Sequence, residues 1–485
     1  MRIRSVGHAC LEIEAKDLTL LTDPWWAGPA YEAQWFPFPE PLPGRLEERA
    51  ADYLYLSHGH EDHLHLPTLR RLPRSTTVLV PELLAGDLAP LLQGELGFHD
   101  VVVLRHGRTQ TLRRGIQATC YLNATDSMLV LSDGDRVLVD ANDALHASQP
   151  AVVDYFCRLL RERHPHIDTL FLGFAGASWA PNCLRLPGKD DRAEARAREE
   201  ALVETFVDVV EKLRPRLACA FAASFALADP QLAWVNEVKL EVAAPDVAWR
   251  RRHPSGGTSV HLLLPGDLVD GVEVTPGPTP RPSRTTLAAA LEGDGMLGMA
   301  VRARAAPASL TPERLRELAM RLADRAGEQS SRLWGRRPFE AELRLRDTPG
   351  TAIRLSFDGR RAWAALGPSR RCPVALELRA EILEAVLREP YGFEAVTIGY
   401  GAIARLSAPA DVERVHDVLR LLRPRRPVWR LVADELARGP ARLARSVWDQ
   451  RLPLALALAG RWGLLRDRDI TTRPASGEVP RRQAA

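Results

Sequence analysis

The fold of this chain is decided by one short stretch of sequence, Ser57-His58-Gly59-His60-Glu61-Asp62-His63. It emerges from residues 53–57, whose aromatic and aliphatic side chains favour a β-strand. Three histidines and one aspartate fall within six positions of this stretch. Such a cluster is costly unless its donors share a metal ion. We therefore interpret it as a metal site rather than as a polar surface loop that is rich in histidine by chance.

The spacing of the motif indicates how its side chains would be used. In a loop at the end of a strand, alternate residues can point toward one centre, so His58 and His60 are predicted to reach one metal ion together. Asp62 and His63 follow at the turn into a helix and are predicted to reach a second. Imidazole and carboxylate ligands suit zinc, iron or manganese. We predict one or two divalent ions, zinc or iron, as the cofactor, and Asp62 is also a candidate for orienting the nucleophile.

The composition indicates a globular protein of two or three domains. The chain has 485 residues, 46% of them hydrophobic, and a net charge of +3. So small a charge argues against nucleic acid as a partner. The six cysteines lie far apart, no apolar run is long enough for a membrane span, and the chain opens without a signal-peptide pattern. A cytoplasmic protein is therefore expected, and the sequence carries no signal for its oligomeric state.

The pattern of apolar residues divides the chain into four parts. Residues 1–245 alternate short apolar runs with helical stretches, which predicts an α/β sandwich. Residues 246–304 are rich in proline and glycine and are expected to form a linker. Residues 305–425 predict a second, smaller α/β domain, and residues 426–485 are expected to form a helical and mobile tail.

The motif and its surroundings resemble a known superfamily. HGHEDH at positions 58–63 matches the HxHxDH motif of the metallo-β-lactamase superfamily, which implies an αββα sandwich and a divalent metal. Residues 6–10 (VGHAC) and 21–25 (LTDPW) resemble the subgroup of lactonases and phospholipase D-like enzymes. A stronger resemblance, to the metallo-β-lactamase portion of CMP-N-acetylneuraminate hydroxylase, rests on Gly28-Pro29-Ala30, residues 62–69 (DHLHLPTL), Asn142-Asp143-Ala144 and Gly176-Ala177-Ser178. It covers about the first half of the chain and specifies the fold and the metal better than the reaction.

The resemblance also implies a bridging carboxylate after the predicted strand 136–139, and we assign this role to Asp143. Asp140 ends the same strand and is the alternative. A bridging carboxylate holds two metal ions close together, as two-metal sites require. Without a metal, either aspartate would be a turn residue that caps the next segment.

Two histidines that the superfamily usually supplies are absent. One would lie near residues 123–127, where this chain has Asn123 and Asp126, and the other would follow a late strand, where it has residues 174–178 (FAGAS). The site is therefore expected to hold one metal ion or to use a substitute ligand such as Asp126. The Cys-x-His and Cys-x-x-His pairs of the hydroxylase's Rieske module are absent too, so in an oxidation either the electrons would come from elsewhere or the metal centre would itself activate oxygen.

Several other residues are candidates for the surroundings of the site. His8 is expected either to support a ligand or simply to pack, and His65 to lie beside the site rather than to bind metal. Ser178 has no histidine partner that the sequence places for it, so we do not expect a nucleophile there. Three tryptophans are expected to shape a substrate pocket or to fill the core, namely Trp25, Trp26 and Trp35.

The second domain, residues 305–425, weakly resembles a sterol-carrier-like domain with an apolar cavity. The resemblance rests on the order of strands, on residues 378–381 (LRAE) and on residues 399–401 (GYG) before a final helix. The alternative is an α/β partner domain that covers the active site or mediates dimerisation. A cavity there would favour an apolar ligand.

Three functions remain compatible with the sequence. The first is a metal-dependent hydrolase that acts on an ester, a lactone or a phosphodiester of a small molecule, apolar or phosphorylated. The second is a non-heme iron oxygenase on the same scaffold, which the hydroxylase-like segments and the missing histidines favour. The third is a binding protein with a degenerate metal site. Metal content and oxygen consumption distinguish the three.

Overall fold

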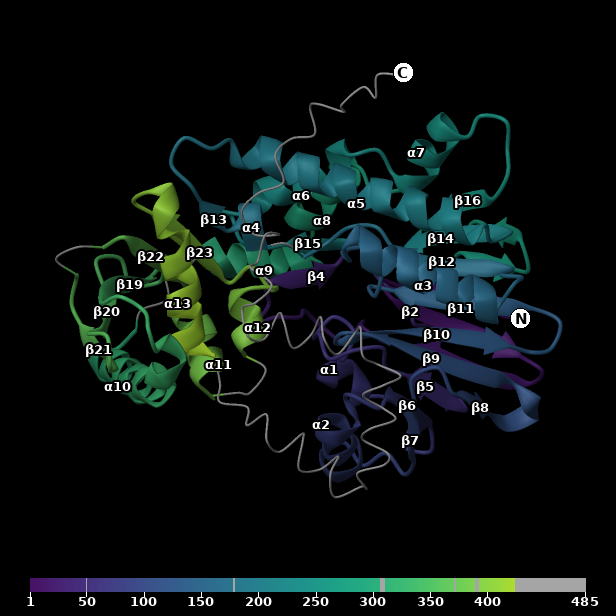
Figure 1. Ribbon diagram of the computed structural model, residues 1–485, viewed down its shortest axis with the longest axis horizontal. Helices are drawn as coiled ribbons and strands as arrows, with labels where there is room; N and C mark the ends of the chain where they lie inside the picture. Colours follow the sequence, from purple (N-terminus) through teal and green to yellow (C-terminus); the bar gives the residue numbers. More distant parts are fainter. Residues whose placement is uncertain (49, 178, 306–309, 370–371, 389–391, 424–485) are drawn as a thin grey trace, which may run out of the picture.

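The computed structural model describes residues 1–48, 50–177, 179–305, 310–369, 372–388 and 392–423 (Figure 1). Ser178 and the predicted tail 426–485 lie outside the described residues. None of the described helices is both long enough and apolar enough to cross a bilayer.

The first half of the chain forms two large sheets. The first sheet has eight strands in the order β18 (Glu273–Thr275), β17 (Leu268–Asp270), β1 (Arg2–Gly7), β2 (Cys10–Ala15), β3 (Leu18–Thr22), β5 (Tyr53–Tyr55), β6 (Thr77–Pro81) and β7 (Val101–Leu104). The second has seven strands in the order β16 (Ser259–Leu262), β14 (Leu217–Phe221), β12 (Thr169–Gly173), β11 (Val137–Asn142), β10 (Asp126–Ser132), β9 (Gln117–Asn123) and β8 (Thr109–Thr111).

Alternating side chains explain why these sheets pack face to face. In β2, Leu11 and Ile13 are fully buried between the sheets, whereas Glu12 and Glu14 point outward. Leu129 of the second sheet enters the same core. Burial of these apolar surfaces is the main favourable term in the free energy of folding.

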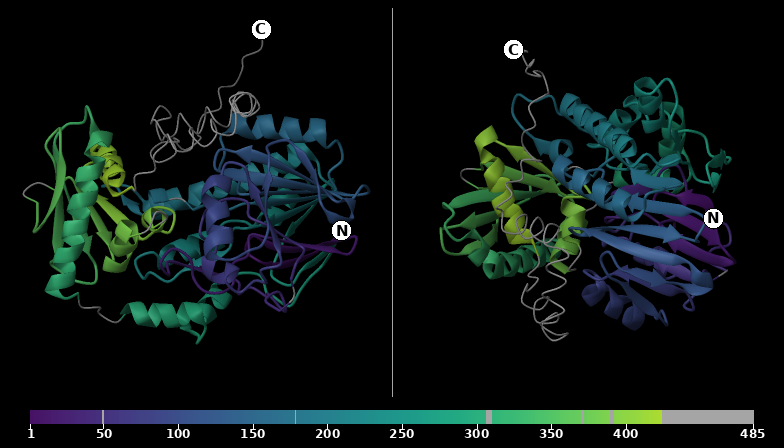
Figure 2. Two further views of the ribbon diagram at one scale, coloured as in Figure 1. Left: turned by 90° about the horizontal axis from the view of Figure 1, so that it is seen from below. Right: turned by 45° about the vertical axis from the view of Figure 1, so that its right-hand side comes forward.

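Helices cover the outer faces of both sheets, as Figures 1 and 2 show. The first sheet carries α1 (Leu66–Leu69) and α2 (Ala85–Pro90), and the second carries α3 (Pro150–Arg163), α5 (Asp191–Leu213) and α7 (Pro245–Arg252). The layers run helix, sheet, sheet, helix. The predicted αββα sandwich is therefore confirmed.

Residues 246–304, which composition suggested to be a linker, contribute to the sandwich. They supply β16 to the second sheet and β17 and β18 to the first. Two helices follow, α8 (Arg284–Glu292) and α9 (Met296–Ala305). The prolines lie between these short elements, where a missing backbone N–H costs no ladder bond.

The second domain is a six-stranded sheet with helices on it. The strand order is β13 (Leu184–Arg185), β23 (Ala402–Leu406), β22 (Val374–Leu378), β19 (Phe339–Leu345), β20 (Ala352–Phe357) and β21 (Ala362–Leu366). Its helices are α10 (Pro312–Gln329), α11 (Ala380–Arg388), α12 (Phe393–Val396) and α13 (Val412–Leu422). The expected smaller α/β domain is present, and its likeness to a sterol-carrier domain stays a prediction.

The two domains share a strand and a core. β13 precedes the second domain in sequence by more than a hundred residues, yet it pairs in parallel with β23. The two-stranded sheet of β4 (Trp35–Pro37) and β15 (Phe225–Leu227) borders the junction, together with α4 (Trp179–Asn182) and α6 (Ala233–Glu241). Trp35 and Trp179 are buried in one cluster with Leu355 of β20. The second domain is therefore packed on the sandwich rather than tethered to it.

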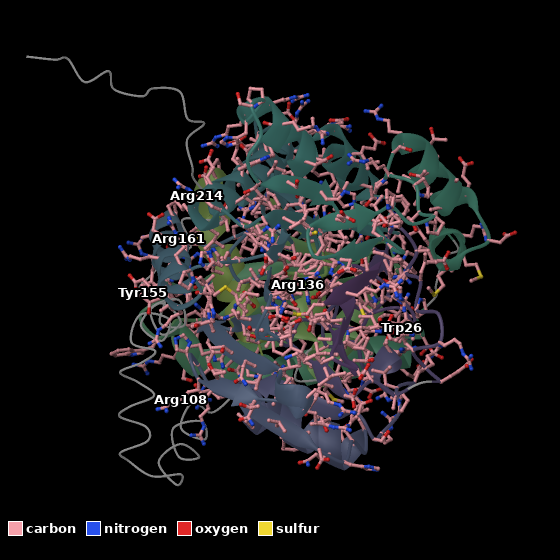
Figure 3. All side chains as sticks on the ribbon, turned by 90° about the vertical axis from the view of Figure 1, so that its right-hand side faces the viewer. Trp26, Arg108, Arg136, Tyr155, Arg161 and Arg214 are labelled. Carbon is pink, nitrogen blue, oxygen red and sulfur yellow. The ribbon has the colours of Figure 1, made fainter. Side chains whose placement is uncertain are left out.

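Arginine side chains on the face seen in Figure 3 are spread over separate elements. Arg108, Arg161 and Arg214 are exposed and lie in the loop before β8, in α3 and at the end of α5.

Candidate metal centre

The candidate site lies where the carboxyl ends of β3 and β5 meet. These strands pair in parallel, so the residues that follow them emerge side by side. Asp23 follows β3 and accepts hydrogen bonds from the Ser57 backbone N–H at 2.8 Å and from Ser57 Oγ at 2.5 Å. These bonds fix the start of the loop 57–63.

The first group of donors is His58, His60 and Asp126. His58 Nε2 lies 2.8 Å from His60 Nδ1 and 3.9 Å from Asp126 Oδ1. Asp126 opens β10 on the facing sheet, so the two sheets jointly build this group. Its three ligand atoms all lie within 4.8 Å of one another, as ligands of one ion would.

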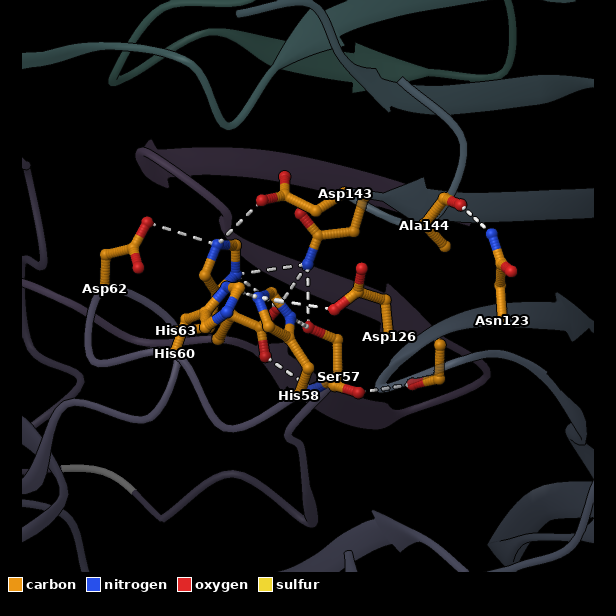
Figure 4. Close-up of polar contacts among 12 residues, drawn as sticks. Ser57, His58, His60, Asp62, His63, Asn123, Asp126, Asp143 and Ala144 are labelled. Atoms are coloured by element: carbon orange, nitrogen blue, oxygen red, sulfur yellow. Dashed lines mark hydrogen bonds and ion pairs between the residues drawn. The ribbon is translucent and has the colours of Figure 1, made fainter. Parts of the chain in front are cut away.

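The second group adjoins the first and is formed by His8, Asp62 and His63. His63 Nε2 lies 3.3 Å from Asp62 Oδ2 and 3.6 Å from Asp143 Oδ2. His8 Nε2 lies 3.0 Å from Asp62 Oδ2. Figure 4 shows His63 between Asp62 and Asp143, with Asp126 beside His58 and His60.

Hydrogen bonds on the far side of each ligand set its orientation. His58 Nδ1 lies 2.9 Å from Ser57 Oγ, and His63 Nδ1 lies 3.0 Å from Asp23 Oδ2. The Nε2 atom of each ring is thereby directed into the site. Tyr31 Oη donates to Asp62 Oδ1 at 2.6 Å. Supporting bonds of this kind orient metal ligands and tune their affinity.

Burial and neighbouring charges give the histidines different pKa values. Burial, reinforced by His63, lowers the pKa of His58 to about 4, and burial, reinforced by His58, lowers the pKa of His60 to about 4. Both are therefore neutral at pH 7 and able to bind metal. Burial would also lower the pKa of His63, but Asp62 and Asp143 outweigh it and raise that pKa well above its usual value.

The three carboxylates of the site differ in their pKa shifts: the pKa values of Asp62 and Asp143 are lowered, and that of Asp126 is raised. Burial would raise the pKa of Asp62, but His63 and then His8 hold it well below its usual value. Burial would likewise raise the pKa of Asp143, but the nearby His146 and His63 lower it. Burial dominates at Asp126 and raises its pKa. A cation in the site would favour the ionised form of all three.

The donor set fits a metal ion. His63 Nε2, Asp126 Oδ1 and Asp143 Oδ1 are buried without a hydrogen-bond partner among the described residues. Buried polar atoms in that state are costly, and here Asp126 belongs to the first donor group and His63 to the second, with Asp143 beside His63. Imidazole nitrogens and carboxylate oxygens suit zinc and iron alike.

Five of the predicted ligands thus come together, His58, His60, Asp62, His63 and Asp143. The alternative carboxylate, Asp140, is buried, and burial followed by repulsion from Asp23 raises its pKa well above the usual range. Its two side-chain oxygens also lack a hydrogen-bond partner among the described residues, whereas Asp143 Oδ2 lies 3.6 Å from His63 Nε2, so Asp143 stays the predicted ligand and Asp140 the alternative. Asn123 turns away from the cluster, since its amide donates to the Ala144 carbonyl at 2.5 Å (Figure 4).

Of the other candidates, His8 belongs to the second donor group, and the remaining described ones take supporting or structural places. His8 contacts Asp62, whereas His65 is turned toward Thr68 Oγ1 and the Pro29 carbonyl, at 2.8 and 3.2 Å. Trp25 packs edge-on against His8, with the ring centroids 4.9 Å apart. The Trp26 indole N–H donates to Glu47, and Trp35 stacks on Phe225.

Three residues of the site escaped the sequence analysis: Asp23, Tyr31 and His146. Asp23 lies in the segment LTDPW, whose resemblance was noted without a role for the carboxylate. His146 follows Asp143 by three positions, a spacing that a search for further ligands would have found. It lies beside Gly173 and Gly176, in the region where the resembled superfamily usually supplies its last histidine. Tyr31 carries no local signal.

Comparisons with known proteins agree with this geometry. Residues 2–128 match the family model described as a Beta-lactamase superfamily domain. A provisionally named Rieske 2Fe-2S iron–sulfur protein of Mycobacterium tuberculosis is 30% identical over 288 residues, which cover 56% of this chain and 54% of that protein. Cytidine monophosphate-N-acetylneuraminic acid hydroxylase of Danio rerio is 23% identical over 279 residues, which cover 55% of this chain and 45% of the hydroxylase. The solved structure of an isothiocyanate hydrolase from Delia radicum gut bacteria has 13% identity and a TM-score of 0.37, and covers 56% of this chain and 100% of that chain.

The chain spans about half the length of these two curated relatives. Their names refer to a hydroxylase and to an iron–sulfur protein, whereas the solved structure is a hydrolase. The family match over residues 2–128 accords with the sandwich and with a divalent metal site, and it does not decide between hydrolysis and oxygenation.

Proposed function

Because residues 2–128 match a family model of a Beta-lactamase superfamily domain, we propose that this protein is a member of the metallo-β-lactamase superfamily and a metal-dependent hydrolase of an ester, lactone or phosphodiester in a small molecule. One observation carries the proposal: His63, Asp126 and Asp143 each have a buried polar atom without a hydrogen-bond partner among the described residues, and they lie in or beside two adjoining donor groups that include two neutral imidazoles. A divalent cation held there would act as a Lewis acid toward a carbonyl or phosphoryl oxygen and would ease the deprotonation of water at neutral pH.

The residues of this chain divide the work between holding and orienting. His58, His60 and Asp126 would hold one ion, and His8, Asp62 and His63 an adjoining one, with Asp143 beside His63. Asp62 accepts from Tyr31 on one oxygen and contacts His8 with the other, so its plane is fixed. A fixed carboxylate in this place is suited to orient an attacking water molecule.

The test is elemental analysis of anaerobically purified protein and of its His60→Ala variant, with His99→Ala as a control that removes an exposed histidine. We expect stoichiometric metal in the native chain and in His99→Ala, and its loss in His60→Ala. Hydrolysis of p-nitrophenyl acetate and of bis(p-nitrophenyl) phosphate should fall about 100-fold or more with the metal. Unchanged metal content in His60→Ala would remove the assigned ligands, and a native chain without affinity for added metal would indicate a binding protein with a degenerate site.

A second candidate function is a non-heme iron oxygenase. Two observations favour it, namely the 23% identity to a hydroxylase and the aspartate at position 126, because carboxylate ligands suit iron well. The chain has no Rieske cysteine–histidine pairs, so an external electron donor would be required. Iron in the purified protein and oxygen consumption with a chemical reductant would select this function. Zinc without oxygen consumption would select the hydrolase.

A further inference from the structure

A cavity of about 260 Å³ lies beside the metal centre. Its walls come from α5, α6, α8 and the loops that follow β12 and β14. Most of its lining is apolar, including Phe38, Phe174, Val203 and Leu287. Two charged side chains, Glu199 of α5 and Lys239 of α6, also line it, and we call it the Lys239 cavity.

The Lys239 ammonium is buried without a hydrogen-bond partner among the described residues. It lies 3.3 Å from the centre of the Phe225 ring, which in turn stacks on Trp35. A cation–π contact of this kind holds the charge in place but satisfies none of its three N–H donors. Only four of the 65 basic residues in this chain are lysines, so a lysine here departs from the strong preference for arginine.

The Lys239 ammonium is a buried charge whose attraction to nearby carboxylates does not offset the cost of its burial. Burial lowers the pKa of Lys239 to about 8, while Glu199 and Asp62 act in the opposite direction. In the part of the chain that the structure describes, no carboxylate oxygen lies within 4.0 Å of this nitrogen. Burial of a charge without an ion pair is expensive, and a bound anion would offset that cost.

The Lys239 cavity and the metal centre share their walls. Ser224 lines the cavity, and its carbonyl lies 3.4 Å from Nδ1 of the metal-centre residue His8. Phe174 also lines the cavity and directly follows Gly173, where an added Cβ would stand 3.2 Å from Asp143 Oδ1. The Lys239 cavity and the metal centre are therefore neighbouring sites.

Two other polar side chains of the lining, Arg281 and Asn236, are already engaged. Arg281 is paired with the buried Asp246, at 2.5 and 3.3 Å. The Asn236 amide exchanges hydrogen bonds with the backbone of Leu227. The Lys239 ammonium remains, without the fork of an arginine that a phosphate dianion prefers. The chemistry that fits is a monoanion on an apolar body.

We propose that the Lys239 cavity binds a carboxylate carried on a short apolar part of the substrate, with Lys239 as the residue that selects it. The volume lies just below the range of about 300–1,000 Å³ for whole drug-sized ligands, so one arm of a substrate fits better than a complete molecule. The proposal rests on the proposed function in one respect, namely that the rest of the same substrate would reach the metal centre. The alternative is that Lys239 and Glu199 form a structural pair.

The test compares the binding of hexanoate with that of 1-hexanol, a neutral molecule with the same apolar body. We expect the native chain to bind hexanoate about tenfold more tightly, the usual scale for a hydrogen bond to a charged group. Lys239→Met should lose this preference and still bind 1-hexanol, whereas Lys212→Met, which removes a lysine outside the cavity, should keep it. Equal affinities in the native chain, or a preference retained in Lys239→Met, would overturn the proposal.

A measurement on the native sequence guards against a variant that fails to fold. With lysine labelled at Cε and Nζ, the chain gives four side-chain signals, which Lys16→Arg, Lys189→Arg and Lys212→Arg assign by elimination. Hexanoate should shift the Lys239 signal and 1-hexanol should not. An unmoved Lys239 signal at saturating hexanoate contradicts the proposal.

The same titration in His60→Ala separates the two proposals. We expect this variant to lose metal and to keep its preference for hexanoate. A native chain that has no affinity for added metal but still prefers hexanoate would overturn the hydrolase proposal and support the cavity proposal. Metal-loaded protein without the preference would overturn the cavity proposal alone.

Discussion

Three residues of the metal centre hold backbone conformations that residues other than glycine rarely adopt. His8, Asp23 and Asn142 have φ values of 50°, 33° and 42°. Each such residue costs of order 1 kcal/mol or more, and the surrounding structure must hold it in place. The Asn142 amide, which donates to Asp23 Oδ2 at 2.5 Å and to Ser57 Oγ at 2.8 Å, contributes to that restraint. The site is therefore rigid before any ligand binds.

Tyr31→Phe tests how far this rigidity supports metal binding. The change removes the hydroxyl that donates to Asp62 and leaves the ring in the core. We expect metal affinity to fall about 10- to 100-fold, the usual effect of a lost supporting bond, with a small change in thermal stability. Competition with a chromophoric chelator measures the affinity. Tyr53→Phe, which removes a hydroxyl bonded to the Arg113 backbone N–H, is the control and should leave it unchanged.

Asp126 offers a second test, because it stands near the place of a histidine usual in the superfamily. Asp126→Ala should lower metal occupancy, since it removes one of the three donors beside His58 and His60. Asp126→His should restore occupancy and shift preference toward zinc over iron, because imidazole is the softer ligand. Metal analysis after dialysis against equal zinc and iron measures both. Full occupancy in Asp126→Ala would exclude it as a ligand.

At this scale the sequence predicted ligands that lie in one local motif. The spacing within residues 58–63 was enough to predict the ligands of the motif. Asp143 was predicted from the family resemblance. Asp23, Tyr31 and His146 act across the sheet, and their distances to the motif depend on strand pairing that local spacing does not encode.

Among the secondary-structure elements, the short strands β16, β17 and β18 depend on one carboxylate. Asp267 accepts from the Leu264 and Gly277 backbone N–H groups and from His261 Nε2, at 2.9, 2.7 and 2.9 Å. It thereby joins the strand on the second sheet to the hairpin on the first. This residue is 2% exposed, so none of these bonds is replaced by water at little cost.

Asp267→Asn should lower the free energy of unfolding by about 1–3 kcal/mol at pH 7, because an amide N–H would face backbone donors. Burial would raise the pKa of Asp267, but His261 and the two backbone N–H groups outweigh it, and the pKa is lowered. A lowered pKa gives stability that is present above about pH 4 and is lost as the pH falls through the folded-state value. The difference in the free energy of unfolding between the native chain and the variant should therefore shrink below pH 4. Urea unfolding at several pH values measures it, and a difference that grows with acid would contradict the account.

Asp133-Gly134 is a dipeptide typical of a hairpin turn, and the structure pairs β10 and β11 antiparallel across it. In residues 246–304, by contrast, local sequence patterns do not reveal the strands. Their strands are three or four residues long and lie among prolines, so no periodicity is visible. They pair with β14 and β1, and β1 lies at the opposite end of the domain in sequence.

Across the whole molecule, the second domain reaches the metal centre through Tyr31. A Cβ added at Gly399 would stand 2.5 Å from Tyr31 Cβ and 2.9 Å from the Ala395 carbonyl oxygen. Tyr400 Oη accepts from the Asn182 amide at 3.1 Å, and the Trp179 indole donates to the Ala402 carbonyl at 2.8 Å. The second domain therefore packs against Tyr31, which positions the candidate metal ligand Asp62.

Gly399→Ala should lower both the melting temperature and metal affinity, because Tyr31 or the loop around Ala395 must move to admit the new methyl group. Gly86→Ala is the matched control, since an added Cβ there meets nothing within 4 Å. We expect the control to bind metal normally and to be slightly more stable, as alanine favours a helix over glycine by up to about 1 kcal/mol. Calorimetry and metal competition measure the two effects. Equal behaviour of the two variants would show that the domains are not coupled at Tyr31.

The strand β13 has a consequence for any attempt to express the second domain by itself. Residues 310–423 alone would leave β23 with a free row of backbone N–H and C=O groups, since its parallel partner comes from the sandwich. Such an open edge recruits strands from other molecules. A shortened chain would tend to oligomerise through this edge or precipitate, and a synthetic peptide that spans Leu184 and Arg185 is the natural candidate to keep it in solution.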